Sequence, residues 1–504
     1  YNRKNMTAVM RIKRFIVCLV GFASMADSVW GQGVSEIFSG VEVTTEAQGS
    51  LGDGKTPLWL NANKYGLSSL DEKNCYIRVA AARPIVVDSM KNWRLGYGLD
   101  LAVAANHSST FVVNQAYVEG SYKKFLITAG AKRRVPLLSN QMLSSGPMTY
   151  GWNSLPIPQL SLDIDWFSVP WTNDFWKIKI HGSYGMTTDG DWQKSFVRKG
   201  EHYTGNVLYH EKAIYLKFGK EDARIPLTYE LGLQMGAQFG GTSYNVFGRV
   251  FEEPTTVKHP VNFRAFINAL ISQGTDETDG SSKNTAGNHF GSWIMRLKWH
   301  GSNWSVAGRF ERYFEDQSMM FVQYGIYDHL LGADITLPDN PYLSAVTIEH
   351  MSTRDQSGAI LHDAAKNIPD KMNGMDNYYN HNLYSGYQHR GQANGNPLLL
   401  SPIYNDNHSL VFFNNRLTAW HFGLSGNPLK WLNWRALATF TRNWGSYDAP
   451  LDDPTNQQYF LLEASANPSL FKGWQAVVGI GIDKGKLIGN NSGVQLTIRK
   501  TFKL

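Results

Sequence analysis

The sequence predicts an all-β fold, a closed antiparallel barrel that crosses a membrane, and three observations support this prediction. Runs of roughly eleven residues alternate between apolar and polar side chains along most of the chain, which suits membrane-spanning strands. No run reaches the roughly 18 apolar residues of a transmembrane helix, so only strands remain to span a bilayer. Charged residues are 18% and aromatic residues 13% of the 504-residue chain, which is typical of barrels with interfacial aromatic belts.

The clearest run is a hairpin from residue 291 to residue 315. The apolar face of its first strand consists of Trp293, Met295, Leu297 and Trp299. The opposite face is polar, with Ile294 as its exception. After a polar break at 300–303 the alternation resumes, with Trp304 first on the apolar face. Because successive side chains of a strand point to opposite faces, each strand has one lipid-compatible face and one polar face.

Similar runs recur along the chain and number roughly sixteen to eighteen, a weak signal for each strand but a strong one in sum. Two clear examples are Trp93 to Val103 and Phe175 to Met186. The last run, Val494 to Leu504, ends the chain with Phe502 near its end, as the closing strand of an outer-membrane barrel does. Other runs lie near residues 37–48, 75–87, 111–121, 124–131, 158–167, 206–219, 228–239, 344–351, 410–424, 431–442, 458–466 and 474–483.

The N-terminus has the pattern of a secretory signal peptide. Basic residues at 11–14 precede a mostly apolar run, Phe15 to Met25, that is too short to span a membrane. We place cleavage after Gly31, so residues 1–31 are the signal peptide, with the residues before Met10 as possible upstream sequence. Residues 32–504 then form a single barrel domain, which we expect in the outer membrane.

Cysteine content and charge exclude several classes of function. Cys18 lies in the predicted signal peptide, which leaves Cys75 alone, a small packed residue with no disulfide partner. We expect no metal and no cofactor. The net charge of +6 comes without a long basic run, so no nucleic-acid partner is expected.

One motif matches a nucleotide-binding loop in letters only. Residues 49–56 fit GxxxxGK[ST], but the preceding strand alternates with charges on one face, and Pro57 follows where a helix should begin. We interpret this segment as a glycine-rich loop between strands.

Catalytic patterns are weak. Asp163 and Asp165 share one strand face and, with His381 and His389, are the suspects for a hydrolase. Two acids facing a hydrated lumen are the simpler interpretation. A catalytic triad is defined by geometry, so spacing alone decides nothing here.

Two stretches lack the alternation of spanning strands, residues 132–160 and residues 353–409. Loops of this length are usually functional or disordered, and in a barrel they lie at the surface or fold into the lumen. Residues 261–273 have apolar side chains at helical spacing and predict a short helix.

The best candidate site is the stretch from 376 to 397. Aromatic rings beside amide and guanidinium donors suit a sugar, which has apolar C–H faces and many hydroxyls; an acidic sugar also favours an arginine. The alternative is a loop that folds into the lumen and bonds to the barrel wall. The candidate polysaccharide-binding residues are Tyr378, Tyr379, His381, Tyr384, Tyr387, His389, Arg390 and Asn394.

Several stretches resemble the Wzi-type capsule assembly proteins of Gram-negative outer membranes, in the divergent branch found beyond the enteric bacteria. They are residues 57–67 (PLWLNANKYGL), 117–132, 153–159 (NSLPIPQ), 207–219, 376–402 and 496–500. The resemblance implies an eighteen-stranded outer-membrane barrel with a lumen closed by loops. It also implies non-enzymatic, lectin-like holding of capsular polysaccharide at the cell surface. The periplasmic helical bundle of well-known members has no clear counterpart before Cys75.

We therefore expect an outer-membrane protein that binds or organises surface polysaccharide, in contact with membrane lipid. Polysaccharide export machinery is an open further partner. A diffusion channel built from the same strands is the first alternative, and an outer-membrane hydrolase is the second.

Overall fold

The computed structural model describes residues 38–504, apart from 248–250, 273, 280–281, 286, 316–325, 357–360, 363–371 and 374–375. The predicted signal peptide, residues 1–31, lies outside the described residues.

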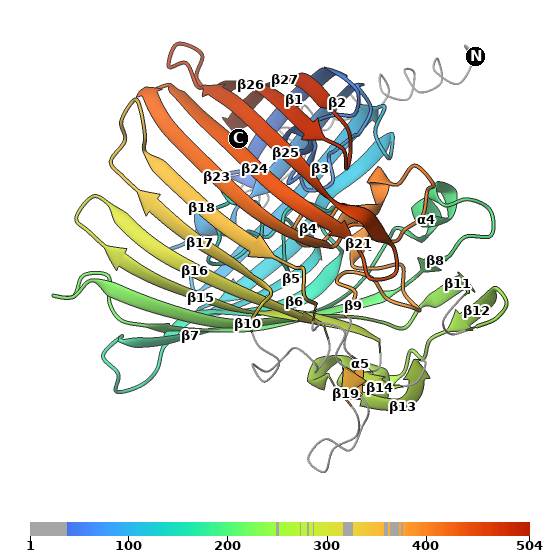
Figure 1. Ribbon diagram of the computed structural model, residues 1–504. Coiled ribbons are helices and arrows are strands. Elements are labelled where there is room, and N and C mark those ends of the chain that lie inside the picture. The colour runs from blue at the N-terminus through green and yellow to red at the C-terminus, as the bar shows by residue number, and fades with distance from the viewer. Residues whose placement is uncertain are drawn as a thin grey trace, which may run out of the picture.

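Eighteen antiparallel strands form one sheet that closes on itself (Figure 1). The first strand, β1 (Glu42–Asp53), pairs with the last, β27 (Asn491–Lys503), along its whole length. The first half of the wall continues with β2 (Lys73–Arg83), β3 (Trp93–Ala105), β4 (Phe111–Tyr122), β5 (Phe125–Ala131), β6 (Gln159–Ser168), β7 (Trp176–Met186), β9 (Leu208–Phe218) and β10 (Leu227–Phe239). The second half consists of β15 (Asn288–His300), β16 (Ser305–Glu315), β17 (His329–Thr336), β18 (Ala345–Ser352), β23 (Arg416–Leu429), β24 (Leu432–Gly445), β25 (Pro450–Ala466) and β26 (Trp474–Gly485).

The predicted barrel is confirmed, with two differences in its strands. The sequence runs missed β17, a strand of eight residues that is short for the alternation signal. The predicted glycine-rich loop at 49–56 is wrong in part, because β1 continues through Gly49 to Asp53 and only then turns at Gly54. Gly49 pairs with Leu496 of β27 on one side and with Cys75 of β2 on the other, so the ladder holds this segment in the wall.

The two faces of the wall follow the sequence alternation. On β27, Val494, Leu496 and Ile498 are 43–48% exposed on the outer face, where lipid would cover them. Polar and charged side chains instead point into the lumen, where Asp100 on β3 is 1% exposed and paired with Arg78 on β2. The predicted apolar faces of the strands therefore point toward the membrane, and the predicted polar faces point into the lumen. Cys75 was expected to be packed inside the protein but is exposed on the outer face of β2.

The connections between strands differ at the two ends of the barrel. At the end that holds the start of β1 and the end of β27, the connections are short, such as residues 123–124 and 301–304. The longest connections all lie at the opposite end, and they include residues 54–72, 132–158 and 353–415. Bacterial outer-membrane barrels have short periplasmic turns and long extracellular loops. The short-turn end is therefore the periplasmic end, and the long-loop end is the extracellular end.

Three of the long connections fold into the lumen and form a plug, which we define as residues 54–72, 132–158 and 376–415. Their apolar side chains form the main hydrophobic core together with inward-facing wall residues; its members include Leu58, Trp59, Leu143, Met148, Tyr209, Phe290, Tyr378, Tyr379, Tyr387, Leu399 and Phe412. This placement also explains Ile294, the apolar exception on a polar face, because Ile294 packs against Leu138 of the plug. The core of this barrel thus lies inside the lumen.

Smaller elements belong to the plug and the extracellular loops. The plug contains α3 (Leu58–Asn61), the two-stranded hairpin of β21 (Gln388–His389) and β22 (Gln392–Ala393), and η3 (Pro402–Tyr404). The loops contain α4 (Gly190–Phe196), β8 (Tyr203–Gly205), β11 (Thr242–Val246), β12 (Thr255–Lys258), β13 (Gly274–Asp279), β14 (Ser282–Thr285), β19 (Leu361–His362) and β20 (Met372–Asn373). One short-turn connection holds η1 (Ile85–Asp88).

The helix predicted within 261–273 is confirmed as α5 (Phe263–Ile271). No helix among the described residues is long and apolar enough to span a membrane.

Candidate functional site

Three of the predicted sugar-binding tyrosines are buried in the plug. Tyr378, Tyr379 and Tyr387 are 0% exposed, so no ring face is open to a ligand. Their hydroxyls bond to other parts of the protein: Tyr378 donates to Asp328 Oδ2 at 3.0 Å, and Tyr379 donates to the carbonyl of Met148. Burial raises the pKa of all three phenols well above the usual value, so they stay protonated donors. These residues hold the plug together, which is the alternative that the sequence left open.

The remaining predicted residues, apart from Arg390, also have structural partners. His389 is 0% exposed, and its Nδ1 lies 2.8 Å from the carbonyl of Leu155. Burial lowers the pKa of His389, so the neutral ring is favoured. Asn394 accepts from the hydroxyl of Ser154 at 2.6 Å. The structure does not bring these groups together around a common cavity.

His381 and Tyr384 lie in the extracellular part of the same segment. Nδ1 of His381 accepts from the backbone N–H of Leu383 at 3.0 Å, which closes a tight turn. Tyr384 stacks on His259, which follows β12, with ring centroids 4.7 Å apart. The Tyr384 ring therefore joins an extracellular loop to the plug, and His381 shapes the turn that precedes it.

Arg390 differs from the other predicted residues because it occupies the tip of a hairpin. It forms the two-residue turn between β21 and β22 with Gly391, and their φ angles are 52° and 75°. Positive φ at both positions defines a type I′ turn. For a residue other than glycine this conformation costs roughly 1–2 kcal/mol. Local strain of this kind concentrates at functional sites. Nη1 of Arg390 donates to Ser109 Oγ at 3.1 Å, in the β3–β4 loop.

Next to this tip lies a stack of three rings that the sequence analysis missed. Trp192 and Phe196 of α4 stack with ring centroids 4.8 Å apart, and Phe196 stacks on His408 at 5.0 Å. Trp192 Nε1 donates to the carbonyl of Ser108, the neighbour of the serine that Arg390 contacts. The rings come from two loops far apart in sequence, so no local spacing could have signalled them. We call Trp192, Phe196, His408 and Arg390 the outer cluster; Figure 1 shows α4 and β21 at the same end of the barrel.

Charged side chains surround the outer cluster. Lys194, Arg198 and Lys199 are exposed on the segment that carries α4. The same segment carries exposed Asp191 and Glu201, so positive and negative charges are mixed around the cluster. Asp406, near His408 in sequence, is paired with Lys55 at 3.0 Å. Nε of Arg390 is buried without a hydrogen-bond partner among the described residues, which leaves one strong donor unused.

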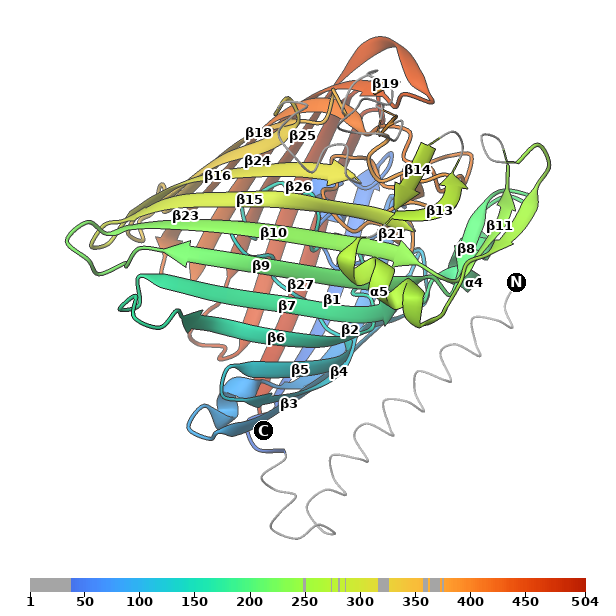
Figure 2. The same cartoon turned by 90° about the horizontal axis from the view of Figure 1, so that it is seen from below.

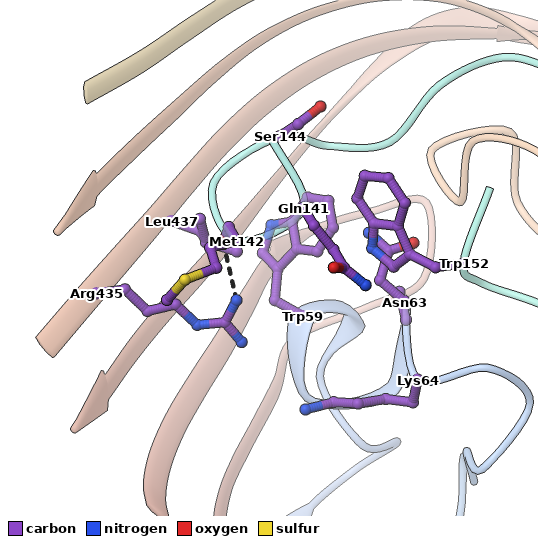
Figure 3. A pocket seen from close by; sticks show the side chains of 10 residues that line it. Trp59, Asn63, Lys64, Gln141, Met142, Ser144, Trp152, Arg435 and Leu437 are labelled. Carbon is purple, nitrogen blue, oxygen red and sulfur yellow. Dashed lines mark hydrogen bonds between the residues drawn. The ribbon is translucent and has the colours of Figure 1, made fainter. Parts of the chain in front are cut away.

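A second site of similar chemistry lies on the opposite side of the plug (Figure 3). It is a cavity of about 120 Å³, lined by Trp59, Ala62, Asn63, Lys64, Gln141, Met142, Ser144, Trp152, Arg435 and Leu437. Figure 3 shows Gln141 between the two tryptophan side chains, with the Lys64 amine below them. Arg435 is near the short-turn end of β24, and Met142 is 57% exposed there, so this lumenal pocket opens toward the periplasm.

The charge of the lumenal pocket comes from two cations. Arg435 is paired with Glu463 at 2.7 Å and donates to the carbonyl of Met142 at 2.8 Å. No carboxylate among the described residues lies within ion-pair distance of Lys64, whose pKa burial lowers. Rings, amides and a cation are the groups that hold a small acidic sugar. Trp59, Asn63 and Lys64 lie in residues 57–67, one of the stretches that resemble the capsule assembly family. The absence of strand alternation there was the signal in the sequence that this stretch is not part of the wall.

The hydrolase suspects are engaged in structural contacts. Asp163 lies 2.7 Å from Nδ1 of His181, and Nε2 of His181 lies 2.6 Å from Nη1 of Arg134. The second ring nitrogen therefore faces a cation and not the hydroxyl nucleophile that an Asp–His pair would activate. Asp165 is paired separately with Lys179 at 3.0 Å.

The fold and these two sites define the class of this protein: an eighteen-stranded outer-membrane β-barrel whose lumen holds a plug. No family model matches the sequence, and no curated protein matches it either. Among solved structures the chain is similar to Wzi of Escherichia coli, an outer-membrane protein involved in group 1 capsule assembly and a carbohydrate-binding β-barrel. The TM-score is 0.54 at 13% identity, over 94% of this chain and 87% of Wzi. At this identity the match shows the fold alone.

Outer-membrane proteins of Pseudomonas aeruginosa also match, at lower scores. OccK3 matches with a TM-score of 0.45 and 9% identity, over 92% of this chain and 96% of OccK3. OprD matches with a TM-score of 0.44 and 8% identity, over 92% of this chain and 95% of OprD.

Proposed function

We propose that this protein is a non-enzymatic outer-membrane protein that binds and organises capsular or other polysaccharide at the cell surface. The observation that carries the proposal is the outer cluster. Its three stacked rings lie beside the strained Arg390, on the extracellular side of a plugged lumen.

The chemistry of the outer cluster suits a glycan. Trp192 and Phe196 are half-buried, and aromatic ring faces of this kind pack on the C–H faces of sugars. The guanidinium offers paired donors to hydroxyls or to the carboxylate of an acidic sugar. Arg390 is half-buried, and beyond the Nη1 bond to Ser109 its guanidinium has further N–H donors for a ligand oxygen. The carbohydrate-binding property of Wzi, a barrel of similar fold, supports the same assignment.

The filled lumen favours binding over conduction. Plug tyrosines with no exposed surface occupy the middle of the barrel, where a diffusion channel would need water. Planar-bilayer recordings test the channel alternative directly. A plugged barrel gives little conductance, whereas a steady open-pore current from the unmodified protein would favour the channel.

The binding experiment uses detergent-folded protein and polysaccharide prepared from its own cell surface, with unrelated glycans as controls. The variant Arg390→Gly removes the guanidinium and suits the positive φ of the turn, so folding should be preserved. We expect its affinity to fall about 10-fold or more, because a charged hydrogen bond contributes roughly 1.5–3 kcal/mol.

Lys430→Ala is the matched control, since it removes an exposed cation from the short turn between β23 and β24, at the opposite end of the barrel. We expect its glycan affinity to match that of the unmodified protein. Selective glycan binding that both variants retain would place the site elsewhere, and no binding by correctly folded protein would overturn the proposal.

A further inference from the structure

The helix α5 lies outside the barrel, at the extracellular end of the wall. It follows β10 in sequence and packs on the outer faces of β9 and β10, as Figure 2 shows. Phe266 contacts Phe239 of β10 edge-on at 5.2 Å and Tyr184 of β7 at 5.2 Å. The hydroxyl of Tyr184 donates to the carbonyl of Phe266 at 2.8 Å. These contacts fix the helix against the wall.

The helix α5 exposes several large apolar side chains on the side that faces away from the wall. The face toward the wall carries Phe266 together with the smaller or polar Ala265, Asn268 and Ala269, of which Asn268 and Ala269 are buried. The face away from the wall is apolar: Phe263 is 82% exposed, Ile271 is 56% exposed and Leu270 is 43% exposed. A helix in water turns its apolar face inward. An outward cluster of apolar side chains is favoured next to a non-aqueous surrounding.

Both ends of α5 are fastened. At its start, the side chain of Asn262 accepts from the backbone N–H of Ala265 at 2.9 Å. At its end, Nζ of Lys212 donates to the carbonyl of Leu270 and to Ser272 Oγ, the latter at 2.9 Å. Lys212 projects from the outer face of β9, where an unpaired lysine would be costly in lipid. Here its charge complements the C-terminal carbonyls of the helix.

We propose that α5 is an interfacial anchor whose apolar face inserts into the outer leaflet of the membrane. Its position supports lipid as the occupant, because α5 continues the lipid-facing surface of the barrel wall at the extracellular end. Leu208 of β9 and Phe239 of β10 belong to the hydrophobic cluster between α5 and the wall. Both residues lie at the extracellular ends of their strands. Arg264 is exposed at the first turn, where it can reach the headgroup phosphates. The anchor would hold the extracellular loops at a fixed height above the membrane.

Nitroxide labels on the full chain test this proposal. The background protein carries Cys18→Ser and Cys75→Ala, and labels are placed by Phe263→Cys and, separately, by Ile271→Cys. Leu462→Cys, on the outer face of β25, gives the lipid reference. Arg198→Cys, in the extracellular loops, gives the water reference. The proteins are folded into dioleoylphosphatidylcholine vesicles, and heat-modifiable gel migration confirms folding of each.

The readout compares collision with oxygen, which concentrates in lipid, and with a water-soluble nickel chelate. We expect the oxygen-to-nickel ratio at Phe263→Cys and Ile271→Cys to be several-fold higher than at Arg198→Cys and to approach that at Leu462→Cys. A ratio equal to that at Arg198→Cys would overturn the proposal. Dipolar broadening between labels on different molecules would also overturn it, because a second copy would then cover the helix. Either label position alone decides the result if the other variant does not fold.

Discussion

Oδ2 of Asp189 accepts a hydrogen bond from the backbone N–H of Arg390 at 3.0 Å and thereby joins the extracellular loop to the plug hairpin. The same oxygen accepts from Nε2 of Gln193 on α4 at 2.9 Å. Asp189 is 0% exposed, and of its two carboxylate oxygens Oδ2 accepts both of these bonds, while Oδ1 has no partner among the described residues. The junction sets the position of the strained turn and, with it, the direction of the Arg390 guanidinium beside the stacked rings.

Asp189→Ala should weaken glycan binding although it leaves every ring and cation of the outer cluster in place. The variant leaves the backbone N–H of Arg390 and Nε2 of Gln193 without their acceptor. Each unpaired donor costs about 1–3 kcal/mol, so the Arg390 turn loses its fixed position. We expect the affinity to fall about 10-fold, measured with the same surface polysaccharide. Asp191→Ala changes an exposed acid on the same helix and is the control. Equal affinity in the two variants would show that Asp189 has no positioning role.

Tyr379→Ala combined with Tyr387→Ala should open the lumen. Each substitution removes a buried ring at a typical cost of 3–5 kcal/mol and deletes a hydroxyl that bonds to residues 148–149. The plug should then loosen inside a barrel whose wall ladder is intact. Planar-bilayer recordings should detect new conductance steps. Tyr342→Ala, an 83% exposed residue in a short turn, is the control and should stay closed. A closed double variant would mean that other plug segments seal the lumen.

The extracellular sheet of β8, β11 and β12 should lose stability in acid. Burial lowers the pKa of His202 and of His259 to about 4 each. In the unfolded segment these rings would titrate near the ordinary value of about 6.5. Between these pH values the unfolded segment binds more protons, so stability falls as pH decreases through this window. Hydrogen exchange over residues 242–246, corrected for intrinsic rates, should accelerate from pH 7 to pH 4.5.

The matched variant for this acid response is His202→Gln with His259→Gln, which removes both titrating rings. Its protection over residues 242–246 should vary less with pH than that of the unmodified protein. An acid response of the same size in both proteins would assign the effect to other groups.

Ile294→Ala should destabilise the barrel by about 2–4 kcal/mol, because the side chain fills space between the wall and Leu138 of the plug. Leu297→Ala, on the lipid-facing side of the same strand, is the control and leaves no internal cavity. The guanidinium concentration at the unfolding midpoint, followed by heat-modifiable migration in vesicles, reports both changes. Equal midpoints for the two variants would contradict a packed interface between plug and wall.

The chemistry of the candidate site was predicted better than its location. Rings and polar donors do gather in residues 376–397, but the structure buries Tyr378, Tyr379 and Tyr387 as plug core and leaves Arg390 at a hairpin tip. A tyrosine can stack on a sugar, or it can fill a protein core with its hydroxyl hydrogen-bonded. The residue type alone therefore could not distinguish a binding residue from a core residue. Trp192 and His408 were missed because they meet only through folding.

The sequence by itself determined the barrel, the polarity of its two faces and the short helix α5, because strand alternation and helical spacing are patterns among residues only a few positions apart. It also marked the long connections as different from spanning strands. Only the tertiary structure decided that those connections fill the lumen, that α5 turns its apolar face outward, and that Arg390 lies beside three rings. These arrangements depend on contacts between residues tens to hundreds of positions apart, which no local pattern records, because the closed wall decides where each loop can go.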